Sequence, residues 1–266
     1  MTVNRAYESD VGFASHCAQA AGQLLLSLRA HPPQAVVGSP RELGKLADQR
    51  ANRLIIDEIS RRHPEDAILS EESTDDPGRL TASRVWIVDP LDGTREYTHP
   101  DRSDWAVHIA LWQRGHGITA AAVAAPARGL VATNLNPHMP PEPPSETGRL
   151  RILVSATRPP AVAQAVAVAL HADLIPMGSA GAKTLAVVSG SADAYLHAGG
   201  QWEWDSAAPV GVARGAHLHA SRIDGSPLTY NQPDPYLPDL LICRPRIADT
   251  LLASLSQALQ STAMPL

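Results

Sequence analysis

The chain is poor in several features that mark particular protein classes. Only two cysteines occur in 266 residues, Cys17 and Cys243, and their separation argues against a disulfide framework or a zinc site. Lysine and arginine (22) are fewer than aspartate and glutamate (27), so the basic character of a nucleic-acid-binding protein is absent. No apolar run approaches the ~20 residues of a membrane span, and the N-terminus shows no signal peptide. We therefore expect a cytoplasmic protein that binds neither nucleic acid nor membrane.

The most informative segment that is present is VWIVDPLDGT, residues 85–94. Its apolar start predicts a buried strand that ends at Asp89, where a proline forces a turn. A second carboxylate, Asp92, follows, and Gly93 with Thr94 opens a predicted helix whose N–H groups form an anion site. Two carboxylates at one strand tip are costly to bury unless they are paired or hold a cation. The segment therefore predicts Mg²⁺-dependent phosphate chemistry.

Two other interpretations of this segment can be weighed from the sequence. Asp-Gly is a common turn signal, so the same residues could form only a loop at the end of a strand. A haloacid dehalogenase needs Asp-x-Asp-Gly-Thr, with a carboxylate two residues before Asp92. Position 90 is proline, which excludes that enzyme class.

Further acidic residues lie on both sides of this segment. AILSEES, residues 67–73, predicts a short strand running into Glu71 and Glu72, whose side chains point to opposite faces of an extended chain. Glu71 can therefore reach a metal while Glu72 faces away, although a solvated strand end is the alternative for both. WEWDSAA, residues 202–208, places Asp205 at the start of a helix of small residues, where it could also be only an N-cap.

These three segments, in this order, resemble those of the lithium-sensitive, Mg²⁺-dependent phosphatase superfamily. That superfamily includes inositol monophosphatases, fructose-1,6-bisphosphatases and 3′(2′),5′-bisphosphate nucleotidases. The triplet Arg95-Glu96-Tyr97 resembles the CysQ-type 3′-phosphoadenosine 5′-phosphate (PAP) phosphatases, whereas inositol monophosphatases usually carry Thr-Asn-Phe there. The resemblance covers nearly the whole chain and implies a five-layered αβαβα sandwich, an α+β or α/β fold of the inositol monophosphatase and fructose-1,6-bisphosphatase type.

The resemblance also implies an activity. A Mg²⁺-dependent, Li⁺-sensitive phosphomonoesterase would remove the 3′-phosphate of PAP to give AMP and phosphate, and would act on the related phosphosulfate (PAPS) in sulfate assimilation. The partner is a small-molecule phosphomonoester, and members of the family are often homodimers. Two alternatives stay open: an inositol-1-phosphatase or fructose-1,6-bisphosphatase of the same superfamily, and a non-catalytic sensor of a phosphate ligand.

Metal ligands follow from the same resemblance. One Mg²⁺ would take Glu71, Asp89 and the Leu91 carbonyl, a second would take Asp89, Asp92 and Asp205, and a third, weaker ion could share Glu71. Two such ions clamp both the attacking and the leaving oxygen of an in-line displacement.

Three catalytic residues are implied, namely Thr94, Asp48 and Glu72. Thr94 would accept a proton from the attacking water or orient it, and Asp48 would hydrogen-bond this threonine. The alternative for Asp48 is a carboxylate that only favours a helix dipole. Lys45 stands where the family usually has a threonine, a departure that weakens the Asp48 assignment.

Substrate residues are implied less directly. GSAGAK, residues 178–183, resembles a nucleotide-holding segment but is one residue longer than the family pattern. A bisphosphate requires an extra Arg or Lys in the pocket, and Arg158 is one candidate besides those of the main set. Arg102 could equally be a surface residue. The substrate-binding set is Glu71, Leu91, Asp92, Gly93, Thr94, Arg102, Ser179, Lys183, His197 and Asp205.

The order of predicted elements divides the chain in two. A proline-rich segment, residues 136–148, separates an N-terminal α+β domain (1–135) from a C-terminal α/β domain (149–266). The site should lie in the cleft between them, with Asp205 contributed by the second. Apolar spacing predicts helices over residues 10–30, 47–63, 160–171, 182–189 and 248–259, and strands between residues 68 and 133 and over 152–155.

Overall fold

The computed structural model describes residues 9–138 and 148–263. Most of the predicted proline-rich linker, residues 139–147, lies outside the described residues. The N-terminal part contains α1 (Asp10–Ala30), η2 (Gln34–Val36), α2 (Pro40–Arg62), β1 (Ala67–Ser70), η3 (Pro77–Leu80), β2 (Arg84–Asp92), α3 (Thr94–Tyr97), β3 (Ala106–Gln113), β4 (Gly117–Ala125), η4 (Pro126–Arg128) and β5 (Leu130–Thr133). The C-terminal part contains β6 (Arg151–Ser155), α4 (Ala161–Leu170), β7 (Asp173–Met177), α5 (Ala180–Ser189), β8 (Ala194–Trp202), α6 (Glu203–Gly215), β9 (His219–Ser221), β10 (Tyr236–Cys243) and α7 (Pro245–Ala263).

Two five-stranded sheets form the frame of the molecule. The first has the order β1-β2-β3-β4-β5 and is antiparallel except for the parallel pair of β1 and β2. The second has the order β7-β6-β8-β10-β9, with β6 parallel to both of its neighbours. The short links from β3 to β4 and from β4 to β5 explain the antiparallel pairing of these strands, because antiparallel strands can be joined by tight turns.

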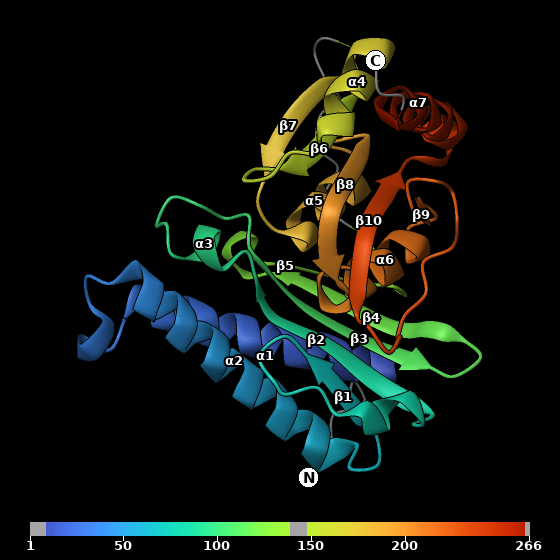
Figure 1. Cartoon of the computed structure of the whole chain (residues 1–266). Helices are drawn as coiled ribbons and strands as arrows, with labels where there is room; N and C mark the ends of the chain where they lie inside the picture. The colour runs from blue at the N-terminus through green and yellow to red at the C-terminus, as the bar shows by residue number, and fades with distance from the viewer. Residues whose placement is uncertain (1–8, 139–147, 264–266) are drawn as a thin grey trace.

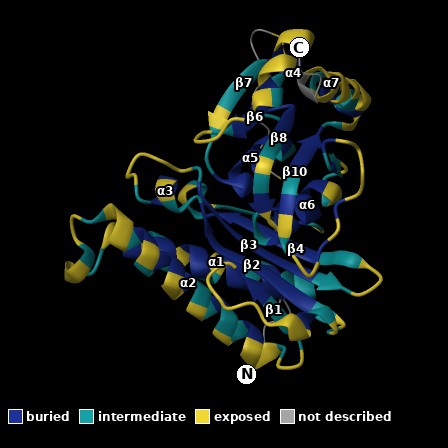
Figure 2. Ribbon diagram, in the orientation of Figure 1, coloured by how far each residue is buried: buried dark blue, intermediate teal, exposed yellow. Residues whose placement is uncertain are grey.

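The helices complete five layers (Figure 1). α1 and α2 cover the outer face of the first sheet, α5 and α6 lie between the two sheets, and α4 and α7 cover the far face of the second sheet. Three apolar clusters correspond to the three interfaces between sheets and helices. α5, between the sheets, is buried along nearly its whole length, whereas β7 at the edge of the second sheet is not (Figure 2). The predicted αβαβα sandwich is therefore confirmed.

The predicted helices all form, but α2, α5 and α7 begin earlier than predicted and α7 also ends later, at Ala263. α2 begins at Pro40 rather than near residue 47, because Ser39 occupies the N-cap position and proline is well suited to the first turn, where its missing N–H is not needed. Its C-cap, His63, lies where the sequence places the end of this helix. Within residues 9–138 and 148–263, no helix has both the length and the apolar character that crossing a bilayer requires.

Candidate active site

Parallel pairing of β1 and β2 brings the first acidic residues together. Ser70 is in register with Val88, and the Glu71 amide donates to the Val88 carbonyl at 3.3 Å, so Glu71 comes beside Asp89. Asp89 is buried, and its carboxylate accepts the Leu91 amide at 3.0 Å. The carboxylates at the ends of these two parallel strands therefore lie side by side at one end of the sheet.

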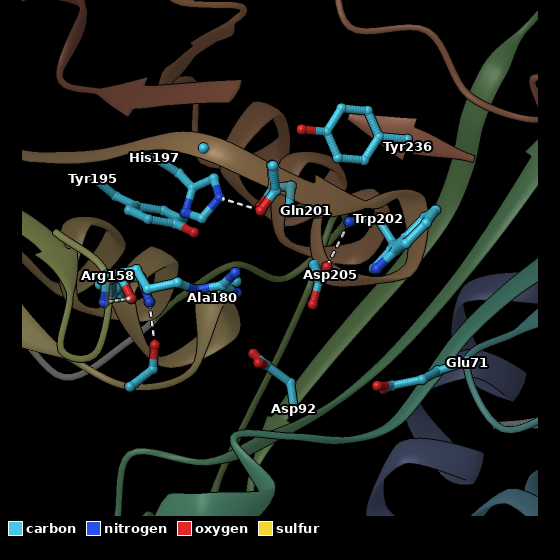
Figure 3. Close-up of a pocket in the computed structure, with 15 residues that line it drawn as sticks. Glu71, Asp92, Arg158, Ala180, Tyr195, His197, Gln201, Trp202, Asp205 and Tyr236 are labelled. Carbon is cyan, nitrogen blue, oxygen red and sulfur yellow. Dashed lines mark hydrogen bonds between the residues drawn. The ribbon is translucent and has the colours of Figure 1, made fainter. Parts of the chain in front are cut away.

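Asp205 reaches this edge from the second half of the chain. It is the third residue of α6, and its carboxylate accepts the backbone N–H of Trp202, the N-cap, at 2.6 Å. Asp205 is thus not itself the N-cap. A cavity of about 460 Å³ opens here, and Glu71, Asp92 and Asp205 from three different elements point toward it (Figure 3).

Burial, followed by mutual repulsion, raises the pKa values of three of these carboxylates. Burial and the neighbouring Glu71, Asp92 and Asp205 raise the pKa of Asp89 well above its usual range. Desolvation in the cavity wall, followed by repulsion from Asp205 and Asp92, raises the pKa of Glu71 to about 7. Burial and Asp92 raise the pKa of Asp205 to about 6. Such a group of mutually repelling oxygen donors is stabilised by a bound cation.

Asp92 behaves differently because it is richly hydrogen-bonded. Burial would raise its pKa, but His108, Lys183 and Ser179 together lower it to about 2. One carboxylate oxygen, Oδ2, accepts the Ser179 hydroxyl and the Gly181 amide (2.9 Å) and lies 3.1 Å from His108 Nε2. These partners all gather on Oδ2, which leaves Oδ1 as the oxygen available to a cation.

His108 is a site residue that the sequence reasoning did not identify. It is fully buried on β3, where Nε2 faces Asp92, and Nδ1 lies 3.8 Å from Asp89 and 3.2 Å from the Trp204 carbonyl. Donor atoms of Asp89, Asp92 and His108 fall within 4.8 Å of one another. The signal in the sequence was a histidine flanked by apolar residues in a predicted buried strand, because buried polar groups require partners.

A glycine makes room for this histidine. A Cβ atom on Gly181 would lie 2.3 Å from His108 Nε2, so α5 can approach β3 this closely only with glycine at that position.

Thr94 and Asp48 lie near each other, and their pairing in catalysis stays a prediction. Hydrogen bonding to Thr94 partly offsets the burial and the repulsion from Glu71 that raise the pKa of Asp48 to about 8. Thr94 Oγ1 also donates to the Leu91 carbonyl at 3.1 Å. Asp48 lies on α2, and among the described residues its Oδ1 has no hydrogen-bond partner.

Residues of the 178–183 segment also reach the cavity. Ser179 is the N-cap of α5 and bonds Asp92, as described above. Lys183 lines the cavity, but its ammonium group donates to the Met177 (3.3 Å), Gly178 and Ser179 (3.0 Å) carbonyls. All three ammonium hydrogens therefore have protein acceptors, and Lys183 orders the turn that presents Ser179. His197 lines the cavity and lies 2.8 Å from the Gly200 carbonyl.

Two predicted site residues, Arg102 and Glu72, lie outside the cavity lining. Arg102 is paired with Asp104 through two hydrogen bonds and does not line the cavity, so its expected contact with substrate is not supported. Asp104 in turn accepts the Gly178 amide at 2.8 Å, which makes Arg102 a support for that turn. Lys45 and Glu72 are both exposed and lie outside the cavity lining.

Two arginines extend the site on its other side. A second cavity of about 270 Å³ shares Asp92, Arg158 and Gly178 with the first and is also lined by Gly93 and Arg95. Arg95 and Arg158 are exposed, so both guanidinium groups are accessible to an anion. The site thus combines two features. The acidic centre consists of Glu71, Asp89, Asp92 and Asp205, and the basic margin consists of Arg95 and Arg158.

Comparisons with known proteins agree with this geometry. The 3′-phosphoadenosine 5′-phosphate phosphatase of Mycobacterium tuberculosis is 54% identical over 243 residues, 90% of each chain. The enzyme of the same name from Mycobacterium leprae is 49% identical over 268 residues, 95% of each chain. Inositol monophosphatase II of Staphylococcus aureus superimposes with a TM-score of 0.73 at 21% identity, covering 91% of this chain and 94% of that one. The sequence model of the inositol monophosphatase family matches residues 7–261, and the chain belongs to that family.

Proposed function

We propose that this protein is a Mg²⁺-dependent phosphomonoesterase that removes the 3′-phosphate of PAP, giving AMP and phosphate, and that it also acts on PAPS. The observation that carries the proposal is that Glu71, Asp92 and Asp205, from both halves of the chain, line one cavity, with the buried Asp89 beside them. The 54% identity to a PAP phosphatase over 90% of the chain supports the choice of substrate. A role in sulfate assimilation and inhibition by Li⁺ are parts of the same proposal.

The acidic centre fits Mg²⁺ because its free donors are oxygens, the ligands this ion prefers. Glu71, Asp89 and the Leu91 carbonyl would hold one ion, and Asp89, Asp92 Oδ1 and Asp205 would hold a second. When bound, the ions supply charge stabilisation for the phosphoryl group and the departing alkoxide. His108 is an imidazole that packs against Asp92 Oδ2, so we assign it to positioning that carboxylate.

The remaining residues have roles in orientation and proton handling. Thr94 would orient the attacking water through Oγ1, and Asp48 would hold Thr94 and accept the proton that this hydroxyl relays. Without bound ions, burial and repulsion from Glu71 raise the pKa of Asp48 to about 8, and a cation beside Glu71 would lower it toward that of a base that is ionised near neutral pH. Glu72 stays a predicted catalytic residue whose side chain faces away from the metal that Glu71 would hold.

A bisphosphate suits the basic margin better than a monophosphate does. Arg158 lines both cavities, and Arg95 lines the second, so one phosphate group can lie at the carboxylates while another meets a guanidinium. Inositol 1-phosphate carries no second phosphate to use these groups. This difference in charge supports PAP over inositol 1-phosphate.

The test is phosphate release from PAP, inositol 1-phosphate and fructose 1,6-bisphosphate, each measured with Mg²⁺ and with added Li⁺. We expect kcat/KM for PAP to exceed both others by at least about tenfold, one factor of ten being ~1.4 kcal/mol, and Li⁺ to inhibit. Comparable values on the three substrates would contradict the nucleotide preference. No turnover of any of them would favour the phosphate-ligand sensor.

A further inference from the structure

Two exposed aromatic side chains form one wall of the larger cavity. Among the described residues, six large hydrophobic side chains are exposed, and only Trp202 (43%) and Tyr236 (46%) are aromatic. Both line the cavity, on the side opposite Tyr195 and His197 (Figure 3). Large apolar surface left open inside a polar cavity indicates a ligand with an apolar face.

The two rings of the wall are packed against other side chains and backbone without any ligand. Trp202 and Tyr236 are cross-strand partners of β8 and β10, with ring centroids 5.7 Å apart at 80°. Trp202 is backed by Trp204, stacked at 5.4 Å and 14°. Tyr236 lies directly over Gly200, where a Cβ atom would be 2.4 Å from the tyrosine hydroxyl. Aromatic rings that are already ordered lose little conformational freedom when a flat ligand stacks on them.

The wall also has a fixed position relative to the acidic centre. The backbone N–H of Trp202 donates to the Asp205 carboxylate at 2.6 Å, so the residue that carries the ring is tied to a proposed metal ligand. A ligand that fills the cavity must therefore have a phosphate at one end and a planar apolar group at the other. The cavity volume of about 460 Å³ is within the range of small-molecule sites.

We propose that Trp202, supported by Tyr236, is the stacking platform for the base of the nucleotide and is a specificity-determining residue of this enzyme. The inference rests on the proposed function. It adds to that function recognition of the base, the chemical group that distinguishes a nucleotide from a sugar phosphate. Every base has a π-face that can stack on an aromatic ring. Inositol and fructose are puckered and covered with hydroxyl groups, so they gain much less from the same surface.

The test compares wild type with Trp202→Ala and Trp202→Phe in PAP hydrolysis, and measures inhibition by AMP and by ribose 5-phosphate, which lacks the base. For Trp202→Ala we expect KM for PAP to rise about tenfold or more, ~1.4 kcal/mol per factor of ten, with kcat within about threefold. The inhibition constant of AMP should rise in parallel, while that of ribose 5-phosphate stays the same. Trp202→Phe keeps a ring and should restore most of the affinity. Val168→Ala, an exposed apolar residue on α4, is the control and should change nothing.

Two results would overturn the inference. A KM for PAP within twofold of wild type in Trp202→Ala would remove the ring from recognition. A parallel rise of both inhibition constants would mean that the substitution had disturbed the phosphate site instead. Failure of the proposed function looks different, because wild type would then leave PAP intact. The two inhibitors would in that case be compared on whichever phosphomonoester the wild type hydrolyses, and equal responses to Trp202→Ala would still reject the platform.

Discussion

Asp89 and Asp92 lie three residues apart on one strand, yet their pKa values shift in opposite directions. Asp89 is surrounded by other carboxylates, which raise its pKa, whereas Asp92 receives hydrogen bonds from Ser179 and Gly181 and lies beside His108. Asp92 is therefore ionised and held in place without a cation. Asp92 is thus a fixed, ionised carboxylate beside carboxylates with raised pKa values, and it gives a cation a ligand that is already in position.

This difference leads to a prediction for Asp92→Asn. The amide has the shape of the carboxylate and can still accept the Gly181 N–H, so we expect an intact fold. Loss of the negative charge should lower kcat for PAP by at least about 100-fold, because charge stabilisation by bound ions supplies several kcal/mol. Phosphate release and thermal unfolding, measured on the same preparation, check both parts.

The matched control for this change is Asp224→Asn in the exposed loop after β9, which should leave kcat unchanged. A kcat within tenfold of wild type in a folded Asp92→Asn protein would remove Asp92 from the chemistry.

At this scale the sequence shows the acidic residues but not their partners. Glu71, Asp89, Asp92 and Asp205 are recognisable because each stands in a motif at the end of a predicted element. His108 has no such motif, since its role depends on β3 pairing with β2 in one register and on Gly181 arriving from another layer. From the sequence, Arg102 is predicted to contact substrate, whereas in the structure it pairs with Asp104. That pairing depends on loop geometry, which a sequence does not specify.

α6 is the element on which the site depends most, because it carries Asp205 and packs against the first sheet. Its small residues Ala207, Ala208, Gly211 and Ala213 are all buried. A Cβ atom on Gly211 would lie 2.4 Å from Ala121 Cβ and 3.0 Å from Ile118 Cγ2 on β4. The helix therefore lies as close to the sheet as a glycine allows.

We expect Gly211→Ala to destabilise the protein by about 1–2 kcal/mol net. Overpacking costs about 1–3 kcal/mol, and a contact of 2.4 Å places this change in the upper half of that range; the better helix propensity of alanine returns up to ~1 kcal/mol. Activity should fall as well, because Asp205 moves with the helix. Denaturant unfolding measures the change, and Arg214→Ala on the exposed face of α6 serves as the control. Unchanged or increased stability in Gly211→Ala would show that the contact is not tight.

Element types were predictable where apolar spacing is long and regular, as in α1 and α7. The start of α2 was not, because residues 40–46 contribute few buried apolar side chains; only Gly44 of this turn is buried. Gly44 packs against the Thr94 and Thr98 methyl groups, which would lie about 3 Å from a Cβ atom at that position. This contact stabilises residues 40–46 as the first part of the helix. Such tertiary support overrides local propensity.

On the scale of the whole molecule, the site joins the two sheets. Glu71, Asp89 and Asp92 come from the first, and Asp205 from the helix that follows β8 of the second. A cation held by both sets would therefore link the two halves. Its removal should affect the stability of the whole chain and not only its activity.

The sign of this effect depends on pH. The pKa values of Asp205 (about 6), Glu71 (about 7) and Asp48 (about 8) are raised above their unfolded values near 4. Such groups stabilise the fold fully below pH 4 and lose that contribution as pH rises through the folded values. Asp92, whose pKa is about 2, has the opposite dependence. Its contribution to stability is present above about pH 4 and is lost as pH falls below that value.

We therefore expect the chelator-treated protein to have a Tm at least about 3 °C lower at pH 8 than at pH 5.5. Added Mg²⁺ should raise the Tm more at pH 8, because the carboxylates are then ionised. Asp89→Asn should reduce both effects. A Tm in chelator that is constant or rises between pH 5.5 and 8 would show that the carboxylates do not repel one another as described.

The most direct test of the metal centre is an anomalous-scattering map from crystals of this protein soaked in Mn²⁺, a substitute for Mg²⁺. We expect two peaks about 3.5–4 Å apart, with Asp89 between them, Glu71 on one and both Asp92 and Asp205 on the other. A map without a peak at Asp89, or with manganese bound only elsewhere, would contradict this arrangement.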